Sequence, residues 1–371
     1  MSEPPLAISC FHQLDPLRQW VDPSIDNSAM DEDDDCISDL KTDGNDMIRL
    51  YILSCMIAAI FTLAITKATA QDRNCEDFLT QEFFASASPE VVAICLEQGR
   101  TVDEHDRDHG NTPLHLAVAY GSDTAVTRVL LQTGADPNVK NSAKFTPMHM
   151  AAMHATEAAK IVTLAVWGAE VDKGTDNDSC RWRDGRLGRC TTTPLHLAAR
   201  RKEAEDIIAA LLASGASLDT FSGKDLKKLH DDENLLEDRY LLPLQLAAKY
   251  ADIGAVSTLL KAGAAVDAKD KNLKRTALHD VAQRGNEAIP IVKALVQAEA
   301  SADEQDANKD TPLMMAAAYT SSAEVFKILL DASNQPCAEN EHGSTALDMH
   351  DRNRALARDD EYWKLHRRCN E

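Results

Sequence analysis

Positive charge and long apolar runs are both scarce in this chain of 371 residues. Lysine and arginine number 39 against 60 aspartate and glutamate residues, which leaves a formal net charge of -21. A phosphate backbone rewards dense positive charge, so the composition argues against nucleic acid as a partner. The length suffices for two ordinary domains or for one long array of repeated units.

Enzyme motifs are missing as well. The sequence contains no G-x-S-x-G turn, no G-x-x-x-x-G-K-[ST] or G-x-G-x-x-G phosphate loop and no HExxH zinc motif. No two cysteines form a C-x-x-C pair, which excludes zinc ribbons and thioredoxin-type sites. The sequence therefore predicts a protein that is not an enzyme and has no catalytic residues, no cofactor and no metal site.

Only one segment is apolar enough to enter a membrane: residues 50–66 are uncharged and lie between Arg49 and Lys67. An A-x-A triplet follows at 68–70, and such a triplet after a basic start and an apolar core is typical of a signal peptide. The run is also at the lower limit of length for a spanning helix. Two interpretations of 47–70 therefore stand. One is a cleaved signal peptide of a periplasmic or secreted protein, and the other is the uncleaved anchor of a single-pass membrane protein.

The residues before this segment form an acidic leader. Residues 1–46 contain twelve Asp or Glu but only two Lys or Arg, with almost no apolar periodicity. Such a stretch buries too little surface to offset its chain entropy, so we predict that 1–46 is disordered. Because Met47 and Arg49 resemble the start of a signal peptide, a second hypothesis is that translation begins at Met47 and that 1–46 is not translated.

One tetrapeptide recurs along the remaining residues, 71–371. Four of the six intervals between successive copies are 34 or 35 residues, and the other two are 47 and 49. The long intervals indicate insertions near 173–191 and 219–241. The copies begin at Thr112, Thr146, Thr193, Leu242, Thr276, Thr311 and Thr345.

This pattern resembles the ankyrin-repeat family, whose signature is T-P-L-H-x-A at a period of 33 residues. The resemblance implies an all-α solenoid of stacked helix-turn-helix units, with about seven repeats after an N-terminal cap. It also implies that the signature histidines are structural, bonded within their own turn and to the next repeat. These are His115, His149, His196 and His279. The cap pattern together with an export signal further resembles exported bacterial ankyrin-repeat proteins.

Six of the nine cysteines lie in 71–371, and an even number after an export signal predicts disulfides. Six cysteines allow 15 pairings, so the pairing has to come from the fold. On an ankyrin scaffold we expect both caps to be stapled, because terminal repeats fray most readily. The expected pairs are Cys75–Cys95, Cys180–Cys190 and Cys337–Cys369.

Two surfaces are candidates for partner binding. The variable position five residues after each signature histidine forms a column along the inner surface, and tyrosine and arginine are frequent hot-spot residues. An arginine-rich loop between Cys180 and Cys190 would be preorganised by a disulfide. The column residues, with one adjacent arginine, are Tyr120, His154, Arg200, Arg201, Tyr250, Arg284 and Tyr319. The loop residues are Arg181, Trp182, Arg183, Arg186 and Arg189.

These observations predict a monomeric, non-catalytic scaffold that is exported and binds a protein partner through the column and the arginine-rich loop. A membrane-anchored ankyrin protein and a secreted effector directed at host proteins are the alternatives. A non-functional interpretation of the column is that half-exposed positions often carry Tyr or Arg without any binding role.

Overall fold

The computed structural model describes residues 75–175, 179–181, 187–189, 191–222 and 241–370. The chain forms two units, 1–65 and 66–371, and every described residue belongs to the second. The acidic leader and the 47–70 segment lie outside the described residues, so their interpretations stay predictions. Across the described ranges, no helix is both long and apolar enough to cross a membrane.

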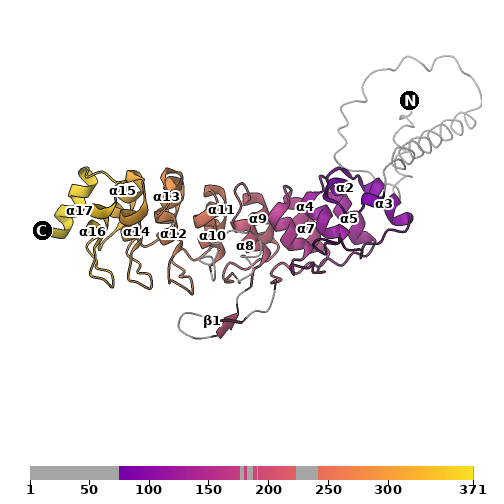
Figure 1. Ribbon diagram of the computed structural model, residues 1–371, viewed down its shortest axis with the longest axis horizontal. Helices are drawn as coiled ribbons and strands as arrows, with labels where there is room; N and C mark the ends of the chain where they lie inside the picture. Colours follow the sequence, from indigo (N-terminus) through magenta and orange to yellow (C-terminus); the bar gives the residue numbers. More distant parts are fainter. Residues whose placement is uncertain (1–74, 176–178, 182–186, 190, 223–240, 371) are drawn as a thin grey trace, which may run out of the picture. The chain divides into compact units, whose positions relative to one another are not determined.

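Helix pairs follow one another along the chain and stack in sequence order (Figure 1). The first helices of the seven repeats are α4 (Pro113–Tyr120), α6 (Pro147–His154), α8 (Pro194–Ala199), α10 (Pro243–Tyr250), α12 (Ala277–Ala282), α14 (Pro312–Tyr319) and α16 (Ala346–Arg352). The second helices are α5 (Thr124–Gln132), α7 (Ala158–Val166), α9 (Glu205–Ala213), α11 (Ile253–Lys261), α13 (Ile289–Gln297), α15 (Ala323–Ala332) and α17 (Asp360–Asn370). A short η7 (Asn286–Ala288) precedes α13. The predicted helical solenoid of seven repeats is confirmed for the described residues, and a short hairpin in the first insertion adds two strands to it.

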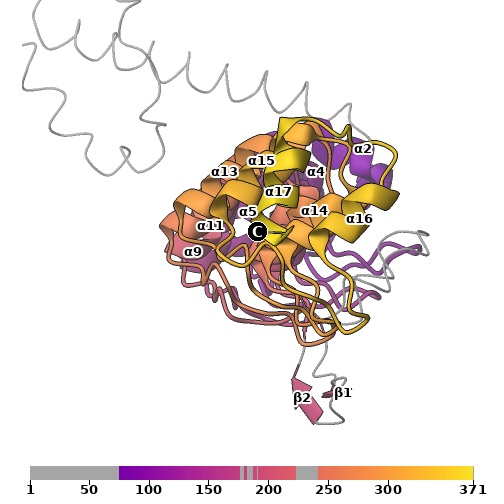
Figure 2. The same cartoon turned by 90° about the vertical axis from the view of Figure 1, so that its left-hand side faces the viewer.

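Each first helix packs on the first helices of its neighbours, and each second helix does the same in a second layer. Figure 2 looks along the stack, with α9, α11, α13 and α15 in one layer, α14 and α16 in the other, and the connecting loops projecting to one side. Local sequence explains the helix starts. Proline stands at the first helical position in five of the seven first helices, where its missing N–H costs nothing.

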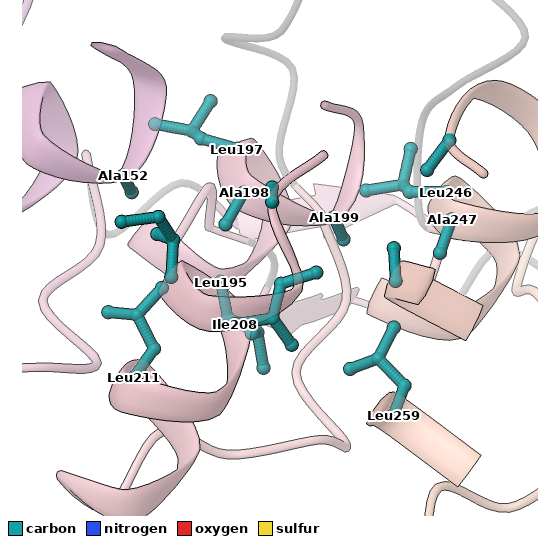
Figure 3. Packing of buried hydrophobic residues seen from close by; sticks show 14 of the residues in the cluster. Ala152, Leu195, Leu197, Ala198, Ala199, Ile208, Leu211, Leu246, Ala247 and Leu259 are labelled. Carbon is teal, nitrogen blue, oxygen red and sulfur yellow. The ribbon is translucent and has the colours of Figure 1, made fainter. Parts of the chain in front are cut away.

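The core runs continuously from repeat to repeat. Leu195, Ala198 and Ala199 of α8 are fully buried, as are Leu246 and Ala247 of α10. Figure 3 shows these side chains between α8, α9 and their neighbours, together with Ile208, Leu211 and Leu259. Alanine at these positions lets adjacent helices approach closely. Each buried leucine contributes roughly 2 kcal/mol by removal of apolar surface from water.

A helix pair without the tetrapeptide caps the first repeat, as predicted. It consists of η4 (Cys75–Asp77), α2 (Gln81–Ser86) and α3 (Pro89–Glu97), with α2 packed on α4 and α3 packed on α5. Three mutually contacting phenylalanine rings fill its interior, with centroids 5.2–5.6 Å apart. They are Phe78, Phe83 and Phe84.

Disulfides close both ends of the stack. Cys75 bonds Cys95 in the N-terminal cap, and Cys337 bonds Cys369 of α17. Two of the three predicted pairs are thereby confirmed. The physical benefit is greatest here, because an end unit has a neighbour on one side only and would otherwise fray.

The first insertion adds an element that the sequence analysis did not predict. Strands β1 (Ser179–Arg181) and β2 (Leu187–Arg189) pair antiparallel, with Cys180 opposite Gly188. Trp182, Arg183, Arg186 and Cys190 lie outside the described residues, and only the backbone of Cys180, Arg181 and Arg189 is described. The Cys180–Cys190 disulfide and the binding role of this loop therefore stay predictions. Most of the second insertion, at 223–240, is likewise outside.

Candidate functional site

The signature histidines form the framework on which the candidate site is built. In each of the four histidines, Nδ1 accepts from the backbone N–H of the threonine three residues earlier, at 3.1–3.2 Å. The opposite ring nitrogen, Nε2, lies 2.8–3.1 Å from a backbone oxygen in the loop leading to the next repeat, that of Phe145, Thr192, Thr220 or Asp310. The predicted structural role is confirmed for His115, His149, His196 and His279. His149 reaches across the whole first insertion to Thr192.

Burial lowers the pKa of each of these four histidines from 6.5 to about 4, although the hydrogen bond to the next loop partly opposes the shift. The rings are therefore neutral at physiological pH, with the proton on Nε2 where the loop carbonyl accepts it. In the fourth repeat Gln245 takes the histidine position. Its Oε1 accepts from the N–H of Leu242, and its Nε2 donates to the carbonyl of Arg275.

A groove of about 940 Å³ lies over the first helices of the first four repeats. Four of the predicted column residues line it, together with the adjacent Arg200: Tyr120, His154, Arg201 and Tyr250. Arg284 and Tyr319 do not line it, although they occupy the same column further along. The structure thus brings only part of the predicted column together in one groove, and partner binding by these residues stays a prediction.

Apolar and aromatic groups form much of the groove lining, together with the cations of Arg200, Arg201 and Lys202 and the carboxylate of Asp108. The Tyr120 and His154 rings lie side by side with centroids 5.6 Å apart. The Arg200 guanidinium lies over the Tyr250 ring at 4.7 Å, a cation–π distance. The pKa of His154 is lowered because the groove desolvates its ring and because the positive charge of Arg201 is near. The exposed Lys202 adds a further cation beside Arg200.

Several lining residues were not predicted as site residues. Met150, Met153, Phe145 and Leu197 supply apolar surface, and Asn141, Ser142 and Ala143 bring one connecting loop into the wall. Met150 sits one residue after a signature histidine, a position that reads as core in the sequence. The sequence signal for its place in the groove is the spacing of Met150, Met153 and the column residue His154, which fall within about one helical turn.

Arg201 already has specific partners within the solenoid. Its Nη1 donates to the carbonyl of Ala152 at 2.9 Å, and its Nη2 donates to that of Ala155 at 3.0 Å. These carbonyls belong to the C-terminal end of α6, where a helix leaves its last C=O groups without internal partners. Arg201 therefore joins the third repeat to the second, and its predicted contact with a binding partner is untested by these bonds.

Arg284 repeats the same arrangement between the fifth and fourth repeats. Its Nη1 donates to the carbonyls of Ala248 at 2.7 Å and Ala251 at 3.4 Å, at the end of α10. The end of α4 receives a different side chain. Lys160 of α7 is 1% exposed, and its Nζ donates to the carbonyls of Val118 and Gly121. Burial lowers the pKa of Lys160, against the influence of Glu157 and Asp123.

No cluster of three His, Cys, Asp or Glu side chains suited to a metal ion occurs among the described residues. What the groove offers chemically is shape, aromatic surface and positive charge.

Comparison with known proteins gives the same architecture. Models of ankyrin repeats match residues 83–175, 280–350 and 192–221. The chain is 31% identical over 191 residues to the neurogenic locus notch homolog protein 1 of Homo sapiens, covering 52% of this chain and 6% of that protein. It is 28% identical over 235 residues to the B-cell lymphoma 3 protein homolog of Mus musculus, covering 56% of this chain and 48% of that protein.

Among solved structures, the human ASB11 ankyrin repeat domain is similar in fold, with a TM-score of 0.52 and 23% identity over 68% of this chain and 96% of that chain. The chain spans less than half of the length of either curated relative. All three proteins come from animals and lend no support to the resemblance to exported bacterial proteins, which stays a prediction. The matched ankyrin models together cover more than half of the chain and coincide with its stacked helix pairs, and the chain therefore belongs to the ankyrin-repeat family.

Proposed function

We propose that this protein is a non-catalytic scaffold that binds a protein partner in the groove over its first four repeats. The observation that carries the proposal is the convergence of Tyr120, His154, Arg200 and Tyr250 on one groove of about 940 Å³. Aromatic and arginine side chains dominate binding energy at protein interfaces, and their rigid helical support lowers the ordering cost of association. The family and its relatives support protein binding as the general role.

The charge of the groove favours an acidic segment of the partner. Arg200, Arg201 and Lys202 follow one another at the end of α8, and all three line the groove. The molecule as a whole carries a net charge of -21, so this local reversal of sign favours partners that place carboxylates there. The Arg-rich loop at 181–189 belongs to the same proposal as a second contact.

The cellular address is part of the proposal too. The disulfides at the two ends support an oxidising compartment, as in the periplasm or outside the cell. The alternatives, a membrane-anchored form and a secreted effector directed at host proteins, would use the same groove in a different cellular location. N-terminal sequencing of the mature protein from cell fractions separates them, since Gln71 as first residue indicates export and an intact 47–70 indicates an anchor.

Site-specific photo-crosslinking in the native host tests the groove. A benzophenone side chain replaces Tyr120 in one variant and Tyr319 in another. Tyr319 is the matched control because it occupies the same column, is 65% exposed and lies outside the groove. We expect a covalent partner adduct from position 120 and none from position 319. Adducts of equal yield from both positions, or from 319 alone, would contradict binding in the groove.

A second measurement quantifies the contact once the adduct is identified. We expect Tyr250→Ala to weaken binding of that partner by at least about tenfold, the effect of losing one aromatic hot spot. Tyr319→Ala should leave the affinity unchanged within error. Isothermal titration with both variants and the unaltered protein measures the difference.

A further inference from the structure

The connecting loops between repeats have a feature that the groove does not explain: three of their tips carry lysine in the left-handed backbone region. The φ angles are +68° at Lys144, +59° at Lys274 and +61° at Lys309. A side chain with a Cβ is strained there, and glycine is the residue that avoids the strain.

Glycine does occupy the equivalent position in two other loops. In the loops that hold Lys144, Lys309 and Gly343, an Asn or Asp three residues earlier accepts from the N–H of the residue after the tip, at 2.9–3.0 Å. The φ of Gly343 is +69°, so the backbone is the same with either residue. Gly110, at +67°, matches Lys274 in the longer type of loop. Lysine at three tips is thus not required by the fold.

The neighbouring loops are fixed to one another. The N–H of Ala307 donates to the carbonyl of Leu273 at 2.7 Å, which joins the loops of Lys274 and Lys309. The loop of Lys144 contributes Ser142 and Ala143 to the wall of the groove. The loops of Lys274 and Lys309 therefore support each other, and the connecting loops of the repeats project on one side of the solenoid (Figure 2).

Charge balance points the same way. Within the described residues, Lys144, Lys274 and Lys309 form no ion pair, whereas Lys269, Lys293, Lys327 and Lys364 each contact a carboxylate. Lys144 and Lys309 are exposed and Lys274 is half-buried, so these strained positions present ammonium groups that no carboxylate of the described residues neutralises. Backbone strain of this kind is commonly retained for function.

We propose that Lys144, Lys274 and Lys309 form a second anchoring surface that binds carboxylates of an acidic, extended segment of the protein partner. The inference rests on the proposed scaffold function and extends it beyond the groove. Lys144 directly follows the groove residues Ser142 and Ala143 in the sequence but does not itself line the groove, and Lys274 and Lys309 belong to loops beyond the fourth repeat. The surface therefore fits a partner segment longer than the groove itself.

Two triple variants of the full chain test the proposal. Replacement of all three lysines by glycine removes both strain and charge, and replacement by arginine keeps the charge at the same strained backbone. We expect the glycine variant to melt on the order of 5 °C higher than the unaltered protein, because it loses the left-handed penalty. The arginine variant should melt at the unaltered temperature. An unchanged melting temperature of the glycine variant would contradict the strain argument.

The binding probe is a random dodecapeptide library displayed on phage and selected on the unaltered protein. We expect selected peptides rich in Asp and Glu, with affinity at least about tenfold lower for the glycine variant and preserved for the arginine variant. The difference should shrink in high salt. Peptides without acidic enrichment, or equal affinity for all three proteins, would overturn the proposal. Binding of the same peptides to the Tyr250→Ala variant tests the groove separately. If the loop-tip variants bind normally but Tyr250→Ala does not, the second anchoring surface is contradicted while the scaffold function still holds.

Discussion

The first helices of the repeats fall into two classes, which differ in the residues just after the signature motif. Four of them, α4, α6, α10 and α14, are eight residues long and include the column residue, which is Tyr or His. In α8 and α12 the helix is six residues long and the column residue, Arg201 or Arg284, lies beyond its end. The seventh repeat is similar, since Asn353 lies just beyond the end of α16.

The shorter helices supply the hydrogen-bond donors that the longer ones need. Arg201 bonds the end of α6, Arg284 bonds the end of α10, and Asn353 donates to the carbonyls of Ala317 and Thr320 at the end of α14. The long α4 is followed by another long first helix, α6, which offers no such donor. The buried Lys160 of α7 donates to the end of α4 instead. A column that reads as one stripe in the sequence thus serves two purposes. Long helices present side chains, and short helices fasten them to the next repeat.

The largest expected effect is acid unfolding, which should not distinguish the two classes. The signature histidine occurs in long helices (His115, His149) and in short ones (His196, His279), each with a pKa lowered to about 4. An unfolded imidazole binds a proton near pH 6.5, so stability is full above that pH and falls as the pH drops towards 4. The loss is about 3 kcal/mol per histidine, on the order of 10 kcal/mol in all.

Circular dichroism during titration from pH 7 to pH 4 measures this unfolding. The matched control replaces the four histidines by glutamine, because Gln245 shows that glutamine makes both bonds without titrating. We expect the control to remain folded across the same interval. If it unfolds at the same pH as the unaltered protein, carboxylates rather than the histidines cause the transition.

The next effect should separate the classes. Arg284→Ala removes two hydrogen bonds from a charged donor and leaves buried carbonyls at the end of α10 unsatisfied, a cost of about 2–3 kcal/mol. Tyr319→Ala, in the same column on a long helix, should cost less than about 0.5 kcal/mol because the ring is 65% exposed. Urea unfolding of both variants gives the two values. Equal costs would remove the distinction between presenting and fastening residues.

Features that are encoded by a few neighbouring residues were predicted, whereas features that depend on contacts between distant residues were not. Thr-Pro-Leu-His at a fixed period encodes each turn and helix start locally, so the solenoid, the cap and the structural role of His149 were predictable. The end disulfides were predictable too, because Cys337 follows α15, Cys369 lies on α17, and successive second helices pack on one another. The donor role of Arg201 and Arg284 was not predictable. It depends on where α8 and α12 end, and on carbonyls 33 to 49 residues away.

The groove shows the same limit. Tyr120, His154, Arg201 and Tyr250 share one column of the sequence and line the groove, whereas Arg284 and Tyr319 share the column and lie outside the groove. The role of Lys160 was not predicted, because nothing in the neighbouring sequence indicates that its ammonium group reaches the preceding repeat. The left-handed backbone of Lys144, Lys274 and Lys309 was not predicted, because backbone angles cannot be read directly from residue types.

The smallest expected effect concerns Asn353, which fastens without charge. Its amide makes two neutral hydrogen bonds, to the carbonyls of Ala317 and Thr320 at 3.0 and 2.9 Å, so Asn353→Ala should cost about 1–2 kcal/mol, less than Arg284→Ala. Because a solenoid opens from its ends, the loss should appear as faster amide exchange in α14 and α16 with little change in α6. Native-state hydrogen exchange resolves the repeats individually. A cost equal to that of Arg284→Ala would mean that satisfied carbonyls, rather than charged donors, set the strength with which neighbouring repeats are joined.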